Sequence, residues 1–182
     1  MQIYGNDYRS VWFEHGRVKM IDQNKLPFDF KIAEYCNYME VAAAIRDMTV
    51  RGAPAIGAAG AYGMALAAMN APDDKFRAYL RSARDELVGT RPTAIDLNNG
   101  VCHVYNTALK FIPDFDHARQ VALLAAREFA HKSEEDCRQI GIIGAEIVPH
   151  GARILTHCNA GALATVAWGT AWSVIRMAPK KN

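Results

Sequence analysis

The chain has 182 residues, of which 51% are hydrophobic and 22% are charged, and its formal net charge at pH 7 is +2. This length is enough to bury a core in one domain, or in one domain plus part of another. So small a net charge gives no argument for binding to nucleic acid or to an acidic membrane surface. We therefore expect neither nucleic acid nor a membrane as a partner.

The first 35 residues have the pattern of a small antiparallel unit. Residues 10–14 and 17–21 are predicted to be two short strands, with His15 and Gly16 in the turn between them. The polar, proline-containing residues 22–27 interrupt this pattern. Residues 28–35 are expected to form a third strand.

From Met39 onward the apolar residues recur at helical spacing, and we predict that residues 1–148 form a mostly helical N-terminal domain. We expect helices at residues 39–50, 54–69, 75–87, 95–111 and 116–147. In the third helix, Phe76, Leu80 and Ala83 are predicted to face the core. In the last helix, Gly141 or Gly144 could introduce a bend.

The second of these helices lies in a run without any charged residue, from Gly52 to Pro72. The run is long enough to span a bilayer, but alanine and glycine are weakly apolar, and this argues against a membrane helix. We predict a buried helix that packs closely on its neighbours. The small residues expected at these contacts are Gly57, Gly60, Ala61 and Gly63.

The turn that begins this helix is a candidate anion site. Arg51, Gly52 and Ala53 precede Pro54, whose missing N–H is harmless in the first turn of a helix. Free backbone N–H groups beside an arginine suit a phosphate, and a glycine lets a ligand approach. A second isolated arginine, Arg91, stands in the next loop. Solvated surface is the alternative interpretation of both arginines.

Polar residues just after Arg91 are open to two interpretations. Asp96, Asn98 and Asn99 could hydrogen-bond a sugar, but helix caps and turns explain them equally well.

After residue 148 the pattern changes to that of an α/β protein, so the predicted class of the whole chain is α/β. Residues 153–157 read as a short buried strand that leads into Cys158 and then into a small-residue helix through Arg176. A strand followed by a polar turn and a helix is the first unit of a doubly wound sheet. A single strand cannot form a parallel sheet, so residues 149–182 are predicted to be the start of a truncated Rossmann-like domain. Completion of the sheet by other chains is the alternative.

The four cysteines are far apart and show neither a CxxC pair nor a metal-ligand spacing; they are Cys36, Cys102, Cys137 and Cys158. The chain shows no secretory signal, so this pattern predicts free thiols in a reducing, cytoplasmic compartment and no metal site. At the expected start of a helix, Cys158 would be favoured as a thiolate. A small buried filler is the alternative for this residue.

Four sequence blocks occur in order: Asp22-Gln-Asn-Lys-Leu-Pro27, Met48-Thr-Val-Arg-Gly-Ala-Pro-Ala-Ile-Gly57, Arg91-Pro-Thr93 and Ile154-Leu-Thr-His-Cys-Asn-Ala-Gly161. Together they resemble the signature of the methylthioribose-1-phosphate isomerase family. The same superfamily includes ribose-1,5-bisphosphate isomerase and the non-catalytic regulatory subunits of a translation-initiation exchange factor. The resemblance implies a helical N-terminal domain, a Rossmann-like domain, a homodimer and no cofactor.

The resemblance also implies an activity, the conversion of 5-methylthioribose 1-phosphate to 5-methylthioribulose 1-phosphate in methionine salvage. Arg51, Gly52 and Ala53 match the substrate-binding segment, Arg91 matches its second anchor, and Cys158 matches the active-site cysteine. The family's general-acid aspartate belongs to a later region that has no match in this chain. We therefore expect the chain alone to be weakly active or inactive. A non-catalytic regulatory protein, or an isomerase of another pentose phosphate, is the alternative.

Overall fold

The computed structural model describes residues 1–181 as a mixed helix and strand fold, which confirms the predicted class. Its strands are β1 (Gln2–Ile3), β2 (Asn6–Asp7), β3 (Val11–Glu14), β4 (Arg17–Ile21) and β5 (Ile32–Tyr35). Its helices are α1 (Tyr38–Arg46), α2 (Ala53–Asn70), α3 (Phe76–Gly89), α4 (Ile95–Leu109), α5 (Phe115–Glu146) and α6 (Ala171–Lys181). Two short 3-10 turns, η1 (Asp73–Lys75) and η2 (Ala162–Ala164), complete the described elements.

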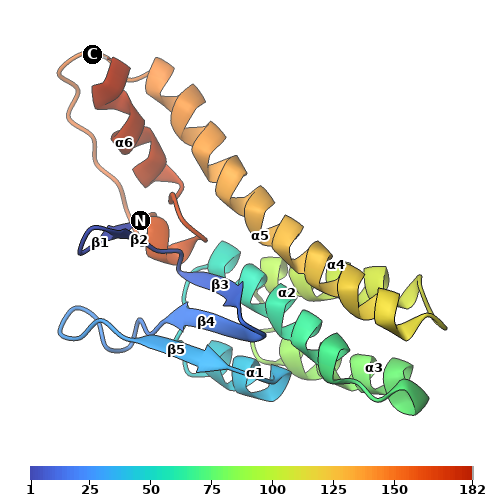
Figure 1. Cartoon of the computed structure of the whole chain (residues 1–182). Helices are drawn as coiled ribbons and strands as arrows, with labels where there is room; N and C mark the ends of the chain where they lie inside the picture. Colours follow the sequence, from blue (N-terminus) through green and yellow to red (C-terminus); the bar gives the residue numbers. More distant parts are fainter. Residues whose placement is uncertain (182) are drawn as a thin grey trace.

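Strands β3, β4 and β5 form an antiparallel sheet in that order, beside the start of the helical part (Figure 1). The predicted hairpin is confirmed: Glu14 pairs with Arg17, and both His15 and Gly16 adopt the positive φ that a tight hairpin turn requires. The third strand is shorter than predicted and begins at Ile32. The pair β1–β2 was not predicted, because strands of two residues show no alternation.

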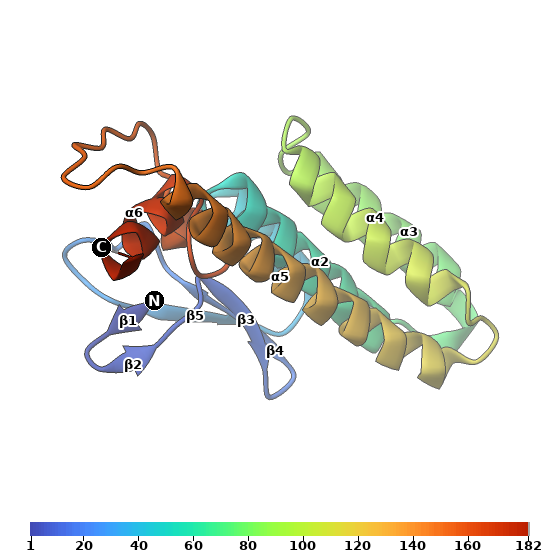
Figure 2. The same cartoon turned by 90° about the horizontal axis from the view of Figure 1, so that it is seen from above.

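Helix α2 is buried along almost its whole length, from Ala55 to Ala68. It packs against α1, α3, α4 and α5 and also against β3 and β4 (Figure 2). A helix surrounded in this way has no face for a charged side chain, which explains the uncharged sequence. The prediction of a buried helix is confirmed. Among the residues that the structure describes, no helix is long and apolar enough to cross a membrane.

Glycines let the backbones of α2 and α4 approach each other. A Cβ atom on Gly57 would lie 2.8 Å from the carbonyl oxygen of Asp96, and one on Gly100 would overlap the carbonyl oxygen of Gly57. A Cβ atom on Gly60 would overlap the side chain of Leu97. Because these contacts begin in the first turns of both helices, α2 and α4 start at the same end of the helical part.

Helix α5 runs without interruption from Phe115 to Glu146, and α6 lies along its C-terminal half (Figure 1). The two glycines that could have bent α5 serve this contact instead. A Cβ atom on Gly141 would lie 2.9 Å from Ser173, and one on Gly144 would lie 3.1 Å from the Cγ1 atom of Val174.

The structure differs from the prediction at residues 153–157, which form no strand. The segment from Gly151 to Asn159 is exposed throughout, and Leu155 is 97% exposed. In Figure 2 this segment, in orange, loops away from the helices. A strand needs a neighbour to bond its backbone groups, and no described strand lies beside it. The predicted domain boundary after residue 148 stays a prediction.

The α2–α4 contact predicts that a substitution at Gly100 destabilises the fold, whereas one at Gly89, outside this contact, does not. Gly100→Ala should reduce the free energy of unfolding by about 1–3 kcal/mol, because its methyl group would overlap the backbone of Gly57. Gly89→Ala, at the end of α3, meets no atom within 4 Å and should be neutral or slightly stabilising. Urea unfolding of the two variants measures the difference. Equal midpoints for both would contradict the close approach of α2 and α4.

Candidate functional site

The start of α2 has the geometry of an anion site. Gly52 precedes the helix with φ 94° and ψ 135°, and its carbonyl oxygen accepts the N–H of Ile56 at 2.9 Å. The first N–H groups of a helix have no intrahelical acceptor, and no side chain caps them here. These N–H groups and the helix dipole together favour a negative charge at this end.

Arg51 stands at this helix start with an uncompensated charge. Its side chain is exposed, its Nη2 donates to Oδ1 of Asn24 at 2.9 Å, and its Nε donates to the carbonyl oxygen of Met48 at 3.4 Å. Both acceptors are neutral. Within residues 1–181 no carboxylate forms an ion pair with Arg51, so its positive charge remains available to a bound anion.

Gly52 is constrained by packing as well as by conformation. A Cβ atom there would overlap the backbone of Ala164, in addition to the cost of the positive φ. The Cβ side of Gly52 is therefore filled by protein, so any contribution of Gly52 to an anion site comes from its backbone. The same contact brings the segment that follows Cys158 onto the start of α2.

This segment is docked by two further hydrogen bonds. The side chain of Gln23 donates to the carbonyl oxygen of Leu163 at 2.8 Å. The backbone N–H of Ser10 donates to the carbonyl oxygen of Val166 at 2.8 Å. The segment that follows the fourth sequence block is thus held against the first and second blocks.

Arg91 lies half-buried in the loop before α4, where its carbonyl oxygen accepts the N–H of Ala94 at 2.9 Å. Because Asp96 packs on Gly57, this loop lies at the same end of the helix pair as Arg51. No hydrogen bond or ion pair within the described chain occupies the guanidinium of Arg91. The structure therefore brings the two loops to one end of the molecule, without a contact between the two arginines.

Cys158 is exposed and lies in a bend with φ 65°. The prediction that it begins a helix is wrong: the next helical turn is Ala162–Ala164, and the next α-helix begins at Ala171. The helix dipole therefore does not act on its thiol. The segment from Arg153 to His157 has no described strand beside it to align it, and this explains the difference.

A hollow of about 300 Å³ lies beside the first residues of α2 and α4, with Pro54, Asp96, Asn99 and Ser133 among its lining residues. Two of the three residues considered for sugar binding, Asp96 and Asn99, therefore face one space. The third does not: Oδ1 of Asn98 instead accepts from the Sγ of Cys102 at 3.4 Å. The sequence alone could not distinguish these faces.

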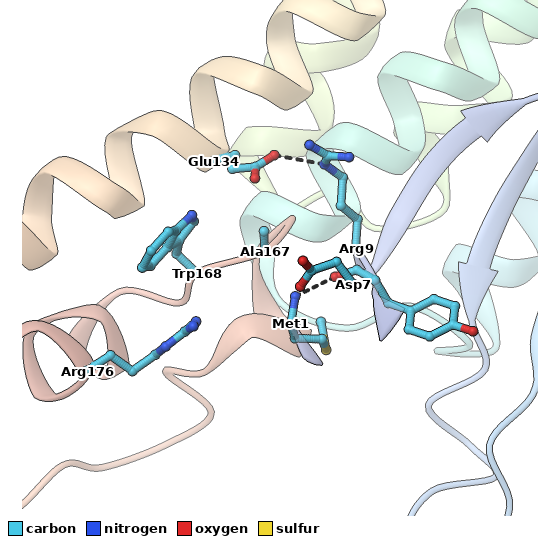
Figure 3. A pocket seen from close by; sticks show the side chains of 8 residues that line it. Met1, Asp7, Arg9, Glu134, Ala167, Trp168 and Arg176 are labelled. Carbon is cyan, nitrogen blue, oxygen red and sulfur yellow. Dashed lines mark hydrogen bonds and ion pairs between the residues drawn. The ribbon is translucent and has the colours of Figure 1, made fainter. Parts of the chain in front are cut away.

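A second hollow, of about 250 Å³, contains none of the predicted site residues (Figure 3). Arg9 pairs there with Glu134 at 2.8 Å, and the guanidinium of Arg176 lies 4.7 Å from the ring centre of Trp168. Sequence reasoning did not find this group, because its members are far apart in the chain and no local motif joins them. Nothing in this hollow resembles a nucleophile with a base. We therefore place the candidate site at the start of α2.

Known proteins match this chain over most of its length, including the start of α2. The model of the Initiation factor 2 subunit family matches residues 49–182. A methylthioribose-1-phosphate isomerase of Desulforudis audaxviator is 40% identical over 171 residues, which cover 93% of this chain and 49% of the relative.

Two solved structures share the fold. A crystal structure of 5-methylthioribose 1-phosphate isomerase from Pyrococcus horikoshii matches with a TM-score of 0.90 and 38% identity, over 96% of this chain and 50% of that one. A crystal structure of translation initiation factor eIF-2B, subunit delta, from A. fulgidus matches with a TM-score of 0.87 and 43% identity, over 96% of this chain and 52% of that one. The chain thus spans about half the length of the relatives it matches.

The cysteines should differ in their rates of alkylation. Cys158 is exposed, whereas Cys137 is only 4% exposed, and burial raises the pKa of the Cys137 thiol. Because the thiolate is the reactive form, iodoacetamide at pH 8 should modify Cys158 well before Cys137. Peptide mass spectrometry over time measures both rates, and labelling in urea is the control in which the difference should disappear. Faster labelling of Cys137 in the folded chain would contradict this placement.

Proposed function

This chain belongs to the Initiation factor 2 subunit family, and we propose that it supplies the phosphate-binding part of an isomerase that converts 5-methylthioribose 1-phosphate to 5-methylthioribulose 1-phosphate. The observation that carries the proposal is the uncompensated Arg51 beside the uncapped start of α2. The relatives from D. audaxviator and P. horikoshii, which are named for this substrate, support the choice of sugar phosphate.

In this proposal the phosphate binds to the guanidinium of Arg51 and to the first N–H groups of α2. A guanidinium recognises a phosphate through paired N–H donors, and a helix N-terminus adds further donors and a favourable dipole. Arg91 approaches from the loop at the same end of the helix pair. The hollow beside Pro54 offers Asp96 and Asn99 as partners for sugar hydroxyls.

The substrate explains why a firm hold on the phosphate is needed. Its anomeric oxygen is phosphorylated, so the sugar cannot open to a free aldehyde. An acid must protonate the ring oxygen while a hydrogen moves from C2 to C1, and phosphate must not be eliminated meanwhile. We assign Cys158 to the reacting end of the sugar on the family resemblance. On the same basis we propose that the whole protein acts as a cytoplasmic homodimer in methionine salvage.

A regulatory protein without catalysis is the second candidate. The name of the A. fulgidus structure, an initiation-factor subunit, favours it. The joint presence of Arg51, Arg91 and Cys158 favours the enzyme, because a scaffold has no need of two unpaired arginines and a thiol in these blocks.

Binding of 5-methylthioribose 1-phosphate, measured by isothermal titration calorimetry, tests the proposal. The chain should bind the sugar phosphate, and Arg51→Gln should weaken binding about tenfold or more, because it removes charge-assisted hydrogen bonds. The matched control is Arg77→Gln, which removes the same charge from an exposed position on α3. Turnover by the chain alone should be slow or absent.

Failure of the wild-type chain to bind the sugar phosphate would contradict the proposed function. Equal affinities of the Arg51→Gln and Arg77→Gln variants would contradict the placement of the phosphate. Robust turnover by the chain alone would show that the general acid lies within it.

A further inference from the structure

The turn before β5 holds the guanidinium of Arg51 through one side chain. In this turn the N–H of Asn24 donates to Oδ1 of Asp22 at 3.0 Å, which closes a local loop around the aspartate. The Nδ2 of Asn24 donates to the carbonyl oxygen of Asp47 at 3.1 Å, and its Oδ1 accepts from Nη2 of Arg51 at 2.9 Å. Both ends of the amide are thus used, and its oxygen faces the arginine.

The carboxylates nearest to Arg51 along these turns are engaged elsewhere. Oδ1 of Asp47 accepts both the N–H of Thr49, at 2.9 Å, and the hydroxyl of Thr49, at 2.8 Å. Asp22 accepts the N–H of Asn24. Neither forms an ion pair with Arg51, so the guanidinium is oriented only by an amide oxygen and by the carbonyl oxygen of Met48.

The donors of Arg51 that remain include both on Nη1, and within the described chain they have no partner. A guanidinium oriented by neutral acceptors keeps its full charge, together with the fork of donors that binds a phosphate in a bidentate manner. An acidic side chain in place of the amide would also orient the guanidinium, but it would cancel that charge.

The turn itself is anchored to the rest of the site. Gln23 is only 8% exposed; its N–H donates to the carbonyl oxygen of Thr49 at 3.0 Å, and its side chain donates to that of Leu163 at 2.8 Å. Neighbouring side chains of one turn therefore hold two segments, one that carries Arg51 and one that follows Cys158. A guanidinium anchored in this way is preorganised, so little conformational entropy is lost in orienting it when a ligand binds.

We propose that Asn24 is a positioning residue for Arg51, and that its neutral amide is what leaves the charge of Arg51 available to a phosphate. This role rests on the proposed function, because it requires an anion at the start of α2. Asn24 acts through Arg51 and need not touch the ligand.

Two substitutions and a matched control test this role, with calorimetric binding of 5-methylthioribose 1-phosphate at low ionic strength. Asn24→Ala removes the acceptor that orients Arg51. It should weaken binding about 3–10-fold, which corresponds to the loss of one hydrogen bond to a charged group. Asn24→Asp keeps the shape, but it loses the Nδ2 donor to Asp47, as Asn24→Ala also does, and pairs with the guanidinium; it should weaken binding more than tenfold. The control is Asn70→Ala, which loses a similar bond, from Nδ2 to the carbonyl oxygen of Cys36 at 3.1 Å, at the opposite end of α2.

Thermal unfolding separates positioning from general damage to the fold. Asn24→Asp gains an ion pair, so its melting temperature should equal or exceed that of Asn24→Ala, although its affinity is lower. In an Arg51→Gln background the Asn24→Asp substitution should have little further effect on affinity, since the charge that it cancels is gone.

The outcomes distinguish this role from the proposed function. A wild-type chain that binds no sugar phosphate overturns the proposed function. A wild-type chain that binds, with an Asn24→Asp variant of equal affinity, overturns the role of Asn24 alone. Losses of affinity that simply follow the melting temperatures in both Asn24 variants also overturn it.

Discussion

Burial of α2 on all sides determines how the surrounding helices and strands are arranged. Four helices and two strands surround it, so between Ala55 and Ala68 it has room only for apolar and small side chains. The glycines at its contact with α4 bring the two backbones together and align the starts of both helices. Because a close-packed interior does not deform easily, the first turn of α2 is held in a fixed position where it reaches the surface.

The fixed position of this helix start determines the geometry and the charge of the candidate site. The packing leaves the first N–H groups uncapped, and Gly52 is held in its positive φ against the backbone of Ala164. Arg51 is oriented there by neutral oxygens, so the helix dipole and the guanidinium act on a bound anion in the same direction. The turn that contains Gln23 and Asn24 ties the loop that carries Arg51 to the segment that follows Cys158.

The sequence predicted those features that depend on local pattern. The β3–β4 hairpin follows from alternation around His15 and Gly16, and the course of α2 follows from its uncharged run and from Pro54. The predicted strand at residues 153–157 was expected to lack partners in this chain, but the pattern did not show that the segment would then form no strand, because pairing depends on neighbours far away in the chain or outside it. For the same reason it misplaced Cys158 at a helix start, and it could not show that Asp96 and Asn99 share a hollow while Asn98 does not. The bond from Asn24 to Arg51 joins residues 27 positions apart, and no spacing rule reveals it.

The proposed function requires that a sugar phosphate bind at the start of α2. A crystal structure of this chain with 5-methylthioribose 1-phosphate tests it most directly. We expect the phosphate within hydrogen-bond distance of the Arg51 guanidinium and of the first N–H groups of α2. A phosphate bound elsewhere, for example beside Arg176 in the hollow of Figure 3, with the start of α2 empty, would contradict this binding site.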